Sequence, residues 1–190
     1  MPQPDHISAF PVPSTASLDD DIKVVYEKCV AKLGMVPNVL RALSLNQKKL
    51  RNFMQTYNEL MLGDSKLSKL EREMVAVVVS SANRCYYCLV AHGQAVRQLS
   101  GDPELGEMMA FNYRVAKLDR RQRAMLDFAW KLTVTPHLVE EQDRAALREA
   151  GLSAEEIFDL ADVVSFFNLS NRMAFALDMM PNREYHKLNR

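Results

Sequence analysis

The sequence predicts an all-α fold, and three observations support this. Apolar residues recur at helical spacing along most of the chain, and no strand–turn–strand alternation interrupts them. Only six glycines are present, and most follow a helical segment, where a left-handed cap is favoured. Two capping boxes, Ser68 with Glu71 and Ser153 with Glu156, are typical of helix starts.

The first third of the chain predicts three helices after an N-terminal arm of residues 1–16. Ser17 is a candidate N-cap, because its side-chain oxygen can accept an unpaired backbone N–H, and it predicts a helix that ends at Gly34. Shorter helices are expected over residues 38–45 and 47–62, and Gly63 ends the second of these.

The remainder predicts about five or six further helices, giving a bundle of roughly eight in one domain over residues 1–190. The Ser68 box opens a helix through the apolar run of residues 74–79, and a break at 83–84 precedes a helix over 85–100. Two or three helices are expected within 103–134, and another over 139–150. The Ser153 box opens a long helix towards Met180, which Pro181 stops.

Two segments of the chain match when the sequence is shifted by 85 residues. The shift places Leu67-Ser68 on Leu152-Ser153, 78–80 on 163–165, and Asn83 on Asn168. The second copy has Ser170 and Met173 where the first has Cys85 and Cys88. We therefore expect a duplicated helical unit, with residues 67–98 as a redox core and 152–180 as a degenerate copy; the alternative is chance together with shared capping preferences.

The composition excludes several function classes. Lys and Arg together number 24, as do Asp and Glu, so the zero net charge gives no reason to expect a nucleic acid or an anionic membrane as partner. The first residues lack the basic and apolar regions of a secretion signal, and no apolar run reaches the roughly 20 residues of a membrane helix. A cytoplasmic location is the resulting expectation, and three cysteines there favour redox or metal chemistry over structural disulfides.

Cys85, Cys88 and His92 carry the chemistry that the sequence predicts. Their positions are i, i+3 and i+7, which share one face of a helix, so two thiols and a base converge. The helix N-terminus and His92 can both lower the pKa of a thiol. Because Cys88 lies one turn before His92, we expect its thiolate to attack a hydroperoxide, and Cys85 to close the disulfide that an external dithiol then reduces.

Glu73 is the candidate partner that orients His92. It precedes the apolar run at 74–79, where an unpaired carboxylate would be costly to bury, although a solvent-exposed Glu73 remains the alternative. Tyr87 is a possible neighbour of the site, and Asn168, Asn171 and Arg172 are expected to brace helices. Cys29 is expected to be a small core residue.

Other uses of a C-x₂-C pair fit the sequence less well. Zinc usually needs a fourth ligand, and the remaining histidines are remote in sequence. A c-type haem site needs histidine directly after Cys88, where Leu89 stands, and a thioredoxin fold needs flanking strands. We expect no bound cofactor or metal.

The spacing Glu73, Cys85, Cys88 and His92 resembles the E-x₁₁-C-x₂-C-x₃-H signature of the AhpD-like alkylhydroperoxidases, within the carboxymuconolactone decarboxylase superfamily. The sequence around residues 35–38, 166–174 and 181–186 resembles that of a subgroup of uncharacterised peroxidase-related proteins. The resemblance implies an all-α fold from a duplicated unit, trimers or hexamers, and a relay from a peroxidatic Cys88 through His92 to Glu73, with Cys85 resolving.

One position departs from the pattern of the best-known members. These carry a second histidine before the second cysteine, where this chain has Tyr87, and a tyrosine is no base near neutral pH. The decarboxylase branch does not use the cysteine pair, so decarboxylation is the weaker expectation.

Two hypotheses of different classes follow for the activity. The first is a peroxidase that acts on small hydroperoxides and is recycled by a lipoyl or thioredoxin-like dithiol. The second is a redox-responsive disulfide module, or a disulfide reductase, without peroxidase turnover. Both require two sulfurs and an imidazole to meet in a partly open crevice.

Overall fold

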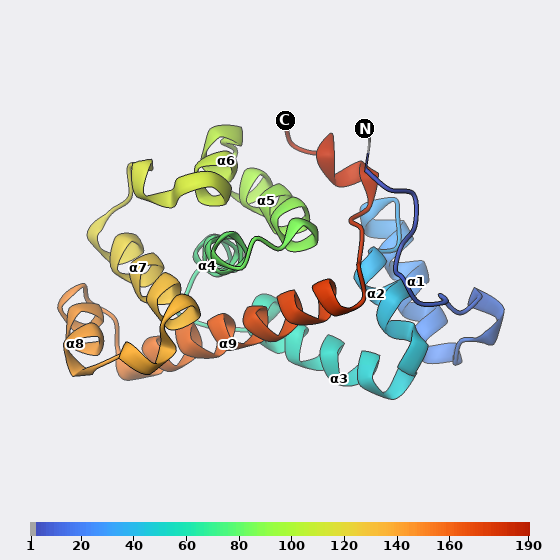
Figure 1. Cartoon of the computed structure of the whole chain (residues 1–190), viewed down its shortest axis with the longest axis horizontal. Helices are drawn as coiled ribbons and strands as arrows, with labels where there is room; N and C mark the ends of the chain where they lie inside the picture. Colours follow the sequence, from blue (N-terminus) through green and yellow to red (C-terminus); the bar gives the residue numbers. More distant parts are fainter. Residues whose placement is uncertain (1–2) are drawn as a thin grey trace.

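Helix α4 (Lys69–Ala82) runs through the middle of the molecule and organises the other helices. The computed structural model describes residues 3–190, and within them every regular element is helical. Nine consecutive residues of α4, Arg72–Ser80, are buried. Figure 1 shows α4 nearly end-on, with α5, α6, α7 and α9 around it. Because this part of α4 is buried on all sides, its apolar residues follow one another directly and do not recur only at every third or fourth position.

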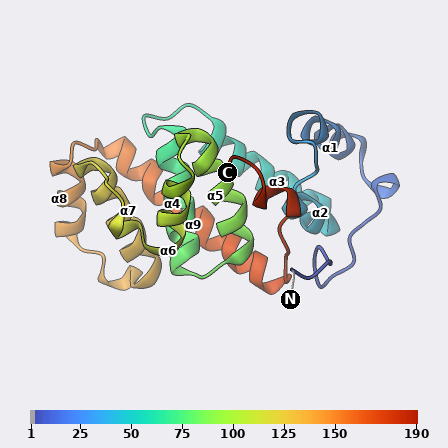
Figure 2. The same ribbon diagram turned by 90° about the horizontal axis from the view of Figure 1, so that it is seen from above.

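The helices around α4 follow the chain in two groups. Before it lie α1, α2 and α3, which form one end of the molecule, and after it come α5 to α9, with α8 at the opposite end (Figures 1 and 2). Their bounds are α1 Asp20–Leu33, α2 Asn38–Leu43, α3 Gln47–Tyr57, α5 Tyr86–Ser100, α6 Pro103–Asn112, α7 Arg120–Val134, α8 Glu141–Glu149 and α9 Ala154–Ala176. The all-α prediction is confirmed.

Both predicted capping boxes are formed. The Ser68 side chain accepts from the backbone N–H of Glu71 and the Glu71 carboxylate accepts from that of Ser68, and Ser153 and Glu156 repeat the arrangement at α9. Each box satisfies two backbone donors that a helix start otherwise leaves unpaired. These boxes therefore fix where α4 and α9 begin.

Two helix ends differ from the prediction. α1 begins at Asp20 rather than Ser17, because the Ser17 hydroxyl donates to the carbonyl of Ser14 and Asp19 takes the N-cap position. α9 ends at Ala176, before Pro181, and Asp178 has a left-handed backbone with φ 46°. The carbonyl of Leu177 then accepts hydrogen bonds from residues near the N-terminus, which no local signal could show.

The end of α3 widens into a π-helical turn, Asn58–Leu62. The buried Arg72 guanidinium donates to the carbonyls of Leu60 and Gly63 at 2.8 and 3.0 Å, so it holds this turn against α4. π-turns replace i→i+4 bonds and are frequent beside functional sites. Here the turn fixes the position of Tyr57, the last residue of α3.

Two sets of hydrogen bonds involve positions that the 85-residue shift places on one another, and the duplication itself stays a prediction. Arg121 donates to both Glu71 and Glu156 at 2.9 Å, and these carboxylates are 85 residues apart. Asn83 donates to the side-chain oxygen of Asn168 at 3.1 Å, again 85 residues away. The two segments thus meet through equivalent side chains at both ends.

Among the described residues, none of the helices combines the length and the apolar character that spanning a bilayer requires.

Candidate active site

The two thiols lie at a sharp junction between α4 and α5. α4 ends at Asn83, and Arg84 adopts a left-handed backbone with φ 58°, which is uncommon for a residue with a Cβ. The Cys85 N–H then bonds to the carbonyl of Ser80 at 2.8 Å, and Cys85 becomes the N-cap of α5. The strained turn at Arg84 is thus the feature that places Cys85 at a helix N-terminus.

An amide network holds this junction against α9. Asn83 donates to Asn168 and Asn171, and Asn171 donates to the Ser80 hydroxyl at 3.0 Å. Arg172 donates to Asn168 at 2.8 Å. These bonds confirm the bracing role expected for Asn168 and Asn171, and they bring Asn171 next to Cys88, whereas the exposed Arg172 bonds only within α9.

Both sulfurs are reduced and buried. Cys85 and Cys88 are each 2% exposed, and both belong to a small apolar group, here called the thiol cluster. Its members are Ala42, Cys85, Tyr87, Cys88, Ala174 and Met179. The open crevice that we expected is therefore absent from this structure, because residues from α2, α9 and the chain ends cover the thiols.

The surroundings of the two thiols shift their pKa values in opposite directions. The pKa of Cys85 is lowered first by the Cys88 thiol, which donates to it, and then by the backbone N–H groups of Cys88 and Tyr87 and by His92, against the effect of burial. The pKa of Cys88 is raised well above its usual range, because its proton is held in the bond to Cys85 and because it is buried. Side chains of Asn171 and Ser170 oppose that rise.

His92 and Glu73 form the hydrogen bond that the sequence predicted. The Nδ1 atom of His92 lies 2.7 Å from Oε2 of Glu73, and the two side chains are 13% and 10% exposed. A carboxylate can only accept, so Nδ1 carries the proton and Nε2 is left with the basic lone pair. The buried Glu73 carboxylate therefore has a hydrogen-bond partner, and without that partner its burial would cost free energy.

An aromatic wall encloses the imidazole. The ring of Phe167 meets His92 edge-on, with centroids 4.7 Å apart, and Tyr57 lies at 6.4 Å. Burial, and then the charge of Glu73, raise the pKa of Tyr57 above its usual range, so its hydroxyl stays protonated. Sequence reasoning missed Tyr57, and no local signal connects it with residues on α4 and α5.

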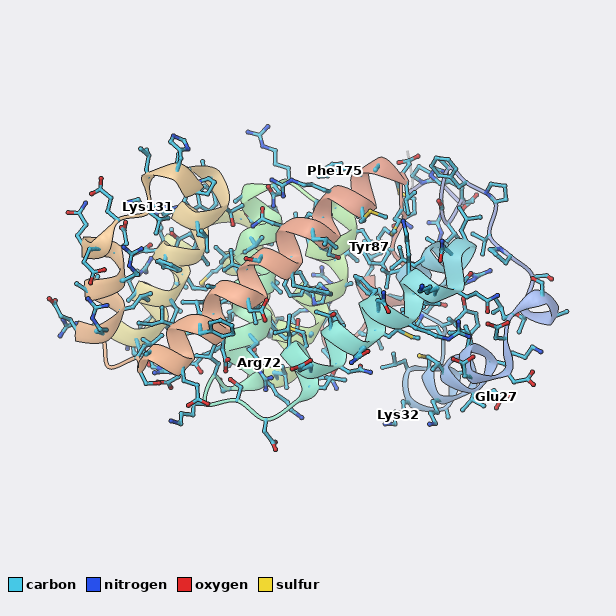
Figure 3. The ribbon with its side chains drawn as sticks, turned by 90° about the horizontal axis from the view of Figure 1, so that it is seen from below. Glu27, Lys32, Arg72, Tyr87, Lys131 and Phe175 are labelled. Atoms are coloured by element: carbon cyan, nitrogen blue, oxygen red, sulfur yellow. The ribbon has the colours of Figure 1, made fainter. Side chains whose placement is uncertain are left out.

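Tyr87 packs within the thiol cluster, but its hydrogen bond goes to another helix. Its hydroxyl accepts the backbone N–H of Val39 at 2.9 Å, which ties α5 to the start of α2. Figure 3 labels Tyr87 between α9 and α2. Burial raises its pKa well above the usual range. At this position the chain therefore has a tyrosine that joins α5 to α2, and not a residue that can act as a base near neutral pH.

The remaining candidates lie apart from the thiol cluster. Cys29 lies on α1 and is half-buried, not the core residue that we expected, and burial raises its pKa. Among residues 3–190 no group of three or more His, Cys, Asp or Glu side chains is placed to hold a metal ion.

The chain is similar to a known family over the segment that contains the site. The profile of the carboxymuconolactone decarboxylase family matches residues 48–126, which include all four signature residues. No curated protein matches the chain. The crystal structure of an uncharacterised peroxidase-related protein from a Silicibacter species is 57% identical over 100% of both chains, with a TM-score of 0.95.

Two further structures extend the comparison. One from Ralstonia eutropha, described as an alkylhydroperoxidase AhpD core and an uncharacterised peroxidase-related protein, is 43% identical over 98% of both chains, with a TM-score of 0.95. The debrominase Bmp8 in complex with 2,3,4-tribromopyrrole is 18% identical over 95% of this chain and 96% of that one, with a TM-score of 0.80. At that identity the likeness concerns the fold alone.

Proposed function

Because the chain belongs to the carboxymuconolactone decarboxylase family, in its AhpD-like branch, we propose that it is a thiol-dependent peroxidase for small alkyl hydroperoxides. The observation that carries the proposal is the hydrogen-bonded thiol pair beside the joined His92 and Glu73. A thiolate, a second thiol and an oriented base are the groups that the reaction needs.

The first chemical step breaks the O–O bond of the peroxide. A thiolate attacks the distal oxygen, which becomes the sulfenic acid oxygen, and the alkoxide leaves as an alcohol after it takes a proton. His92 is the candidate base that takes the thiol proton on Nε2 when the thiolate forms, and it then donates that proton to the alkoxide, while Glu73 stabilises the imidazolium between the two transfers. The surrounding Phe167 and Tyr57 keep bulk water from this pair.

The second and third steps close and reopen the disulfide. The remaining thiol attacks the sulfenic sulfur, water leaves, and Cys85 and Cys88 are joined. An external dithiol, lipoyl or thioredoxin-like, then supplies two electrons and two protons and is itself oxidised to a disulfide. No bound cofactor enters this cycle.

The charge distribution suggests an order for the two sulfurs. Spacing along the helix favoured Cys88 as the attacking group, since it is one turn from His92. The hydrogen bonds of the reduced pair instead stabilise the thiolate on Cys85. The proposal follows the charge, so that Cys85 attacks and Cys88 resolves.

Single-turnover peroxide consumption by the reduced protein tests the proposal. We expect one equivalent to be consumed by the wild type and by Cys29→Ala, and none by the double variant Cys85→Ser with Cys88→Ser. Equal consumption by that double variant would exclude the pair as nucleophile. Trapping of sulfenic acid with dimedone assigns the order: Cys88→Ser should be labelled on Cys85, and label on Cys88 in Cys85→Ser alone would restore the order expected from the spacing.

The burial of both sulfurs keeps a redox-responsive module as the second candidate function. A buried pair can form a stable disulfide that changes the packing of α5 without fast turnover. Sustained peroxide consumption with dihydrolipoamide or thioredoxin supports the enzyme. A disulfide that persists under the same reductants, with a change of assembly, supports the module.

We also propose that the chain forms trimers or hexamers in the cytoplasm. The apolar side chains of Phe111, Phe158 and Val115 are 85%, 71% and 66% exposed, and burial of such side chains between subunits would be favourable. Light scattering of the reduced protein measures the assembly, and a monomer at micromolar concentration contradicts it.

A further inference from the structure

The first described residues form a strap along the C-terminal segment. The N–H of Ala9 donates to the carbonyl of Leu177 at 2.9 Å, and that of Met180 donates to the carbonyl of Ile7 at 3.0 Å. The Ser8 hydroxyl adds a bond to Leu177, also 2.9 Å. Figures 1 and 2 both show the N-terminal segment beside the chain that follows α9. The strap, residues 3–10, is thus held by main-chain bonds at Ile7 and at Ala9.

Charged pairs fasten the strap beyond these bonds. His6 Nε2 lies 2.8 Å from the carboxylate of Asp178, the residue whose left-handed backbone follows the end of α9. Arg183 pairs with Asp5 and donates to the carbonyl of Gln3 at 2.6 Å. These side chains are largely exposed, so each pair contributes little and the strap can open locally at small cost.

Ile7 separates a surface cavity from the thiol cluster. On one side it packs against the cluster that contains Cys85 and Cys88. On the other it lines a cavity of about 420 Å³ between the strap, the start of α2 and the C-terminal segment, with Arg41 and Lys187 among the lining residues. A single half-buried side chain therefore belongs to both the wall of the cavity and the cover of the thiols.

We propose that Ile7 is the gate through which small molecules pass from this cavity to the two thiols, and that its side chain limits their size. The thiols are 2% exposed, so any reagent must wait for an opening. The other apolar side chains that pack on the cluster are Val39, Leu43, Ala91 and Leu177, which belong to helices or a helix cap. Met179 also lies outside a helix, but it is a buried member of the cluster whose N–H bonds to the carbonyl of Ala174 at the end of α9. Ile7 is carried by a non-helical strap, and such segments open at lower free energy than packed helices.

The proposal deepens the proposed function, since it selects small peroxides over bulky ones, but alkylation tests it without any peroxide. The reduced protein is treated with iodoacetamide, which is small, or with pyrenyl maleimide, which is bulky. Peptide mass spectrometry gives the rate at each cysteine, and the half-buried Cys29 serves as an internal reference thiol. If alkylation contradicts the gate, the peroxidase proposal is still tested separately by peroxide consumption. If peroxide consumption contradicts the peroxidase proposal, alkylation still tests the gate.

Ile7→Ala should raise the rate of the bulky reagent at Cys85 about tenfold, which corresponds to about 1.4 kcal/mol of opening free energy. The small reagent should gain less, and the rate at Cys29 should not change. Arg183→Gln, which keeps Ile7 but removes two fastenings of the strap, should raise both rates at Cys85 by about threefold.

Ile157→Ala is the matched control. Ile157 lies on α9 and is partly buried against the main core. Its substitution by alanine removes the same atoms as Ile7→Ala, at a position far from the strap. It should lower the melting temperature and leave the thiol rates unchanged. Unchanged rates in both Ile7→Ala and Arg183→Gln overturn the gate, and so does an equal rise in Ile157→Ala, because access would then follow global stability rather than the strap.

Discussion

The Nδ1 atom of His92 lies 2.7 Å from Oε2 of Glu73, and this hydrogen bond joins two helices that the chain connects by three residues. The carboxylate fixes which imidazole nitrogen is protonated, and it stabilises positive charge on the ring. A relay through His92 therefore depends on Glu73 even though Glu73 touches neither sulfur in the described hydrogen bonds.

Glu73→Gln tests this dependence. The amide oxygen can still accept from Nδ1, but a neutral amide cannot stabilise an imidazolium, so peroxide turnover should fall about 10- to 100-fold with the fold intact. The measurement is steady-state turnover with dihydrolipoamide, together with circular dichroism. Glu59→Gln, an exposed glutamate on the π-helical turn, is the matched control and should keep full activity. Full activity in both variants would remove Glu73 from the relay.

A second prediction concerns the pH dependence of thiol reactivity. The pKa of Cys85 is lowered from 9.0, first by the donated hydrogen bond of Cys88, so its thiolate persists as the pH falls below the range in which an ordinary thiol is protonated. In a Cys29→Ala background, the iodoacetamide rate at Cys85 should therefore have its midpoint below pH 9. Cys88→Ala removes the donor, and it should move that midpoint upward.

The control for this titration is the reverse variant. In Cys85→Ala the remaining Cys88 loses both its acceptor and the neighbouring negative charge that raise its pKa, so its midpoint should fall relative to the wild-type value for Cys88. A midpoint for Cys85 that does not respond to Cys88→Ala contradicts the assignment of the resting thiolate.

The sequence predicted the position of the site but not its burial. The i, i+3 and i+7 spacing brought Cys85, Cys88 and His92 together, because that geometry is local to one helix and its cap. The cover of the thiols depends on Ile7 and Met179, which lie far away in the chain. No periodic signal records such a contact, so a closed site could not be expected.

The helix ends also divide into those set by local signals and those set by contacts with distant residues. Capping boxes and the glycine at position 34 are local signals, and the corresponding helix ends lie where they predict. The early end of α9 depends on hydrogen bonds from Ser8 and Ala9 to Leu177, more than 160 residues along the chain. Likewise, the lowered pKa of Cys85 depends in part on the backbone N–H groups of Cys88 and Tyr87, which face it because Cys85 is the N-cap of α5 after the left-handed Arg84.

A third prediction separates anchoring from chemistry at Tyr87. Tyr87→Phe removes the acceptor of the Val39 N–H and keeps the ring, so it should lower the free energy of unfolding by about 1 kcal/mol. Peroxide consumption should change less than twofold, because no described hydrogen bond joins Tyr87 to a thiol. Denaturant unfolding and single-turnover kinetics measure the two effects. The neighbouring Tyr86→Phe, at an exposed side chain, should alter neither, and a large loss of rate in Tyr87→Phe alone would assign Tyr87 to the reaction.

A fourth prediction concerns Arg121, which joins the starts of α4 and α9 through Glu71 and Glu156. These carboxylates are each 11% exposed at the side chain, so Arg121→Met leaves two nearly buried charges unpaired. The free energy of unfolding at pH 7 should fall by about 2 kcal/mol, less than for a fully buried pair because Arg121 is 26% exposed. Arg120→Met, at an ion pair exposed on both sides, should change it little.

The sign of the pH dependence follows from Glu156. Its folded-state pKa is lowered from 4.5, first by the backbone N–H of Ser153 and also by Arg121, so its contribution to stability is present above pH 4.5 and is lost as the pH falls through the lower folded value. The difference between the wild type and Arg121→Met should therefore shrink as the pH is lowered from 7 to 3. Urea unfolding at both pH values measures it. A difference that stays constant would show that Arg121 acts through its hydrocarbon packing rather than through its charge, since packing does not titrate.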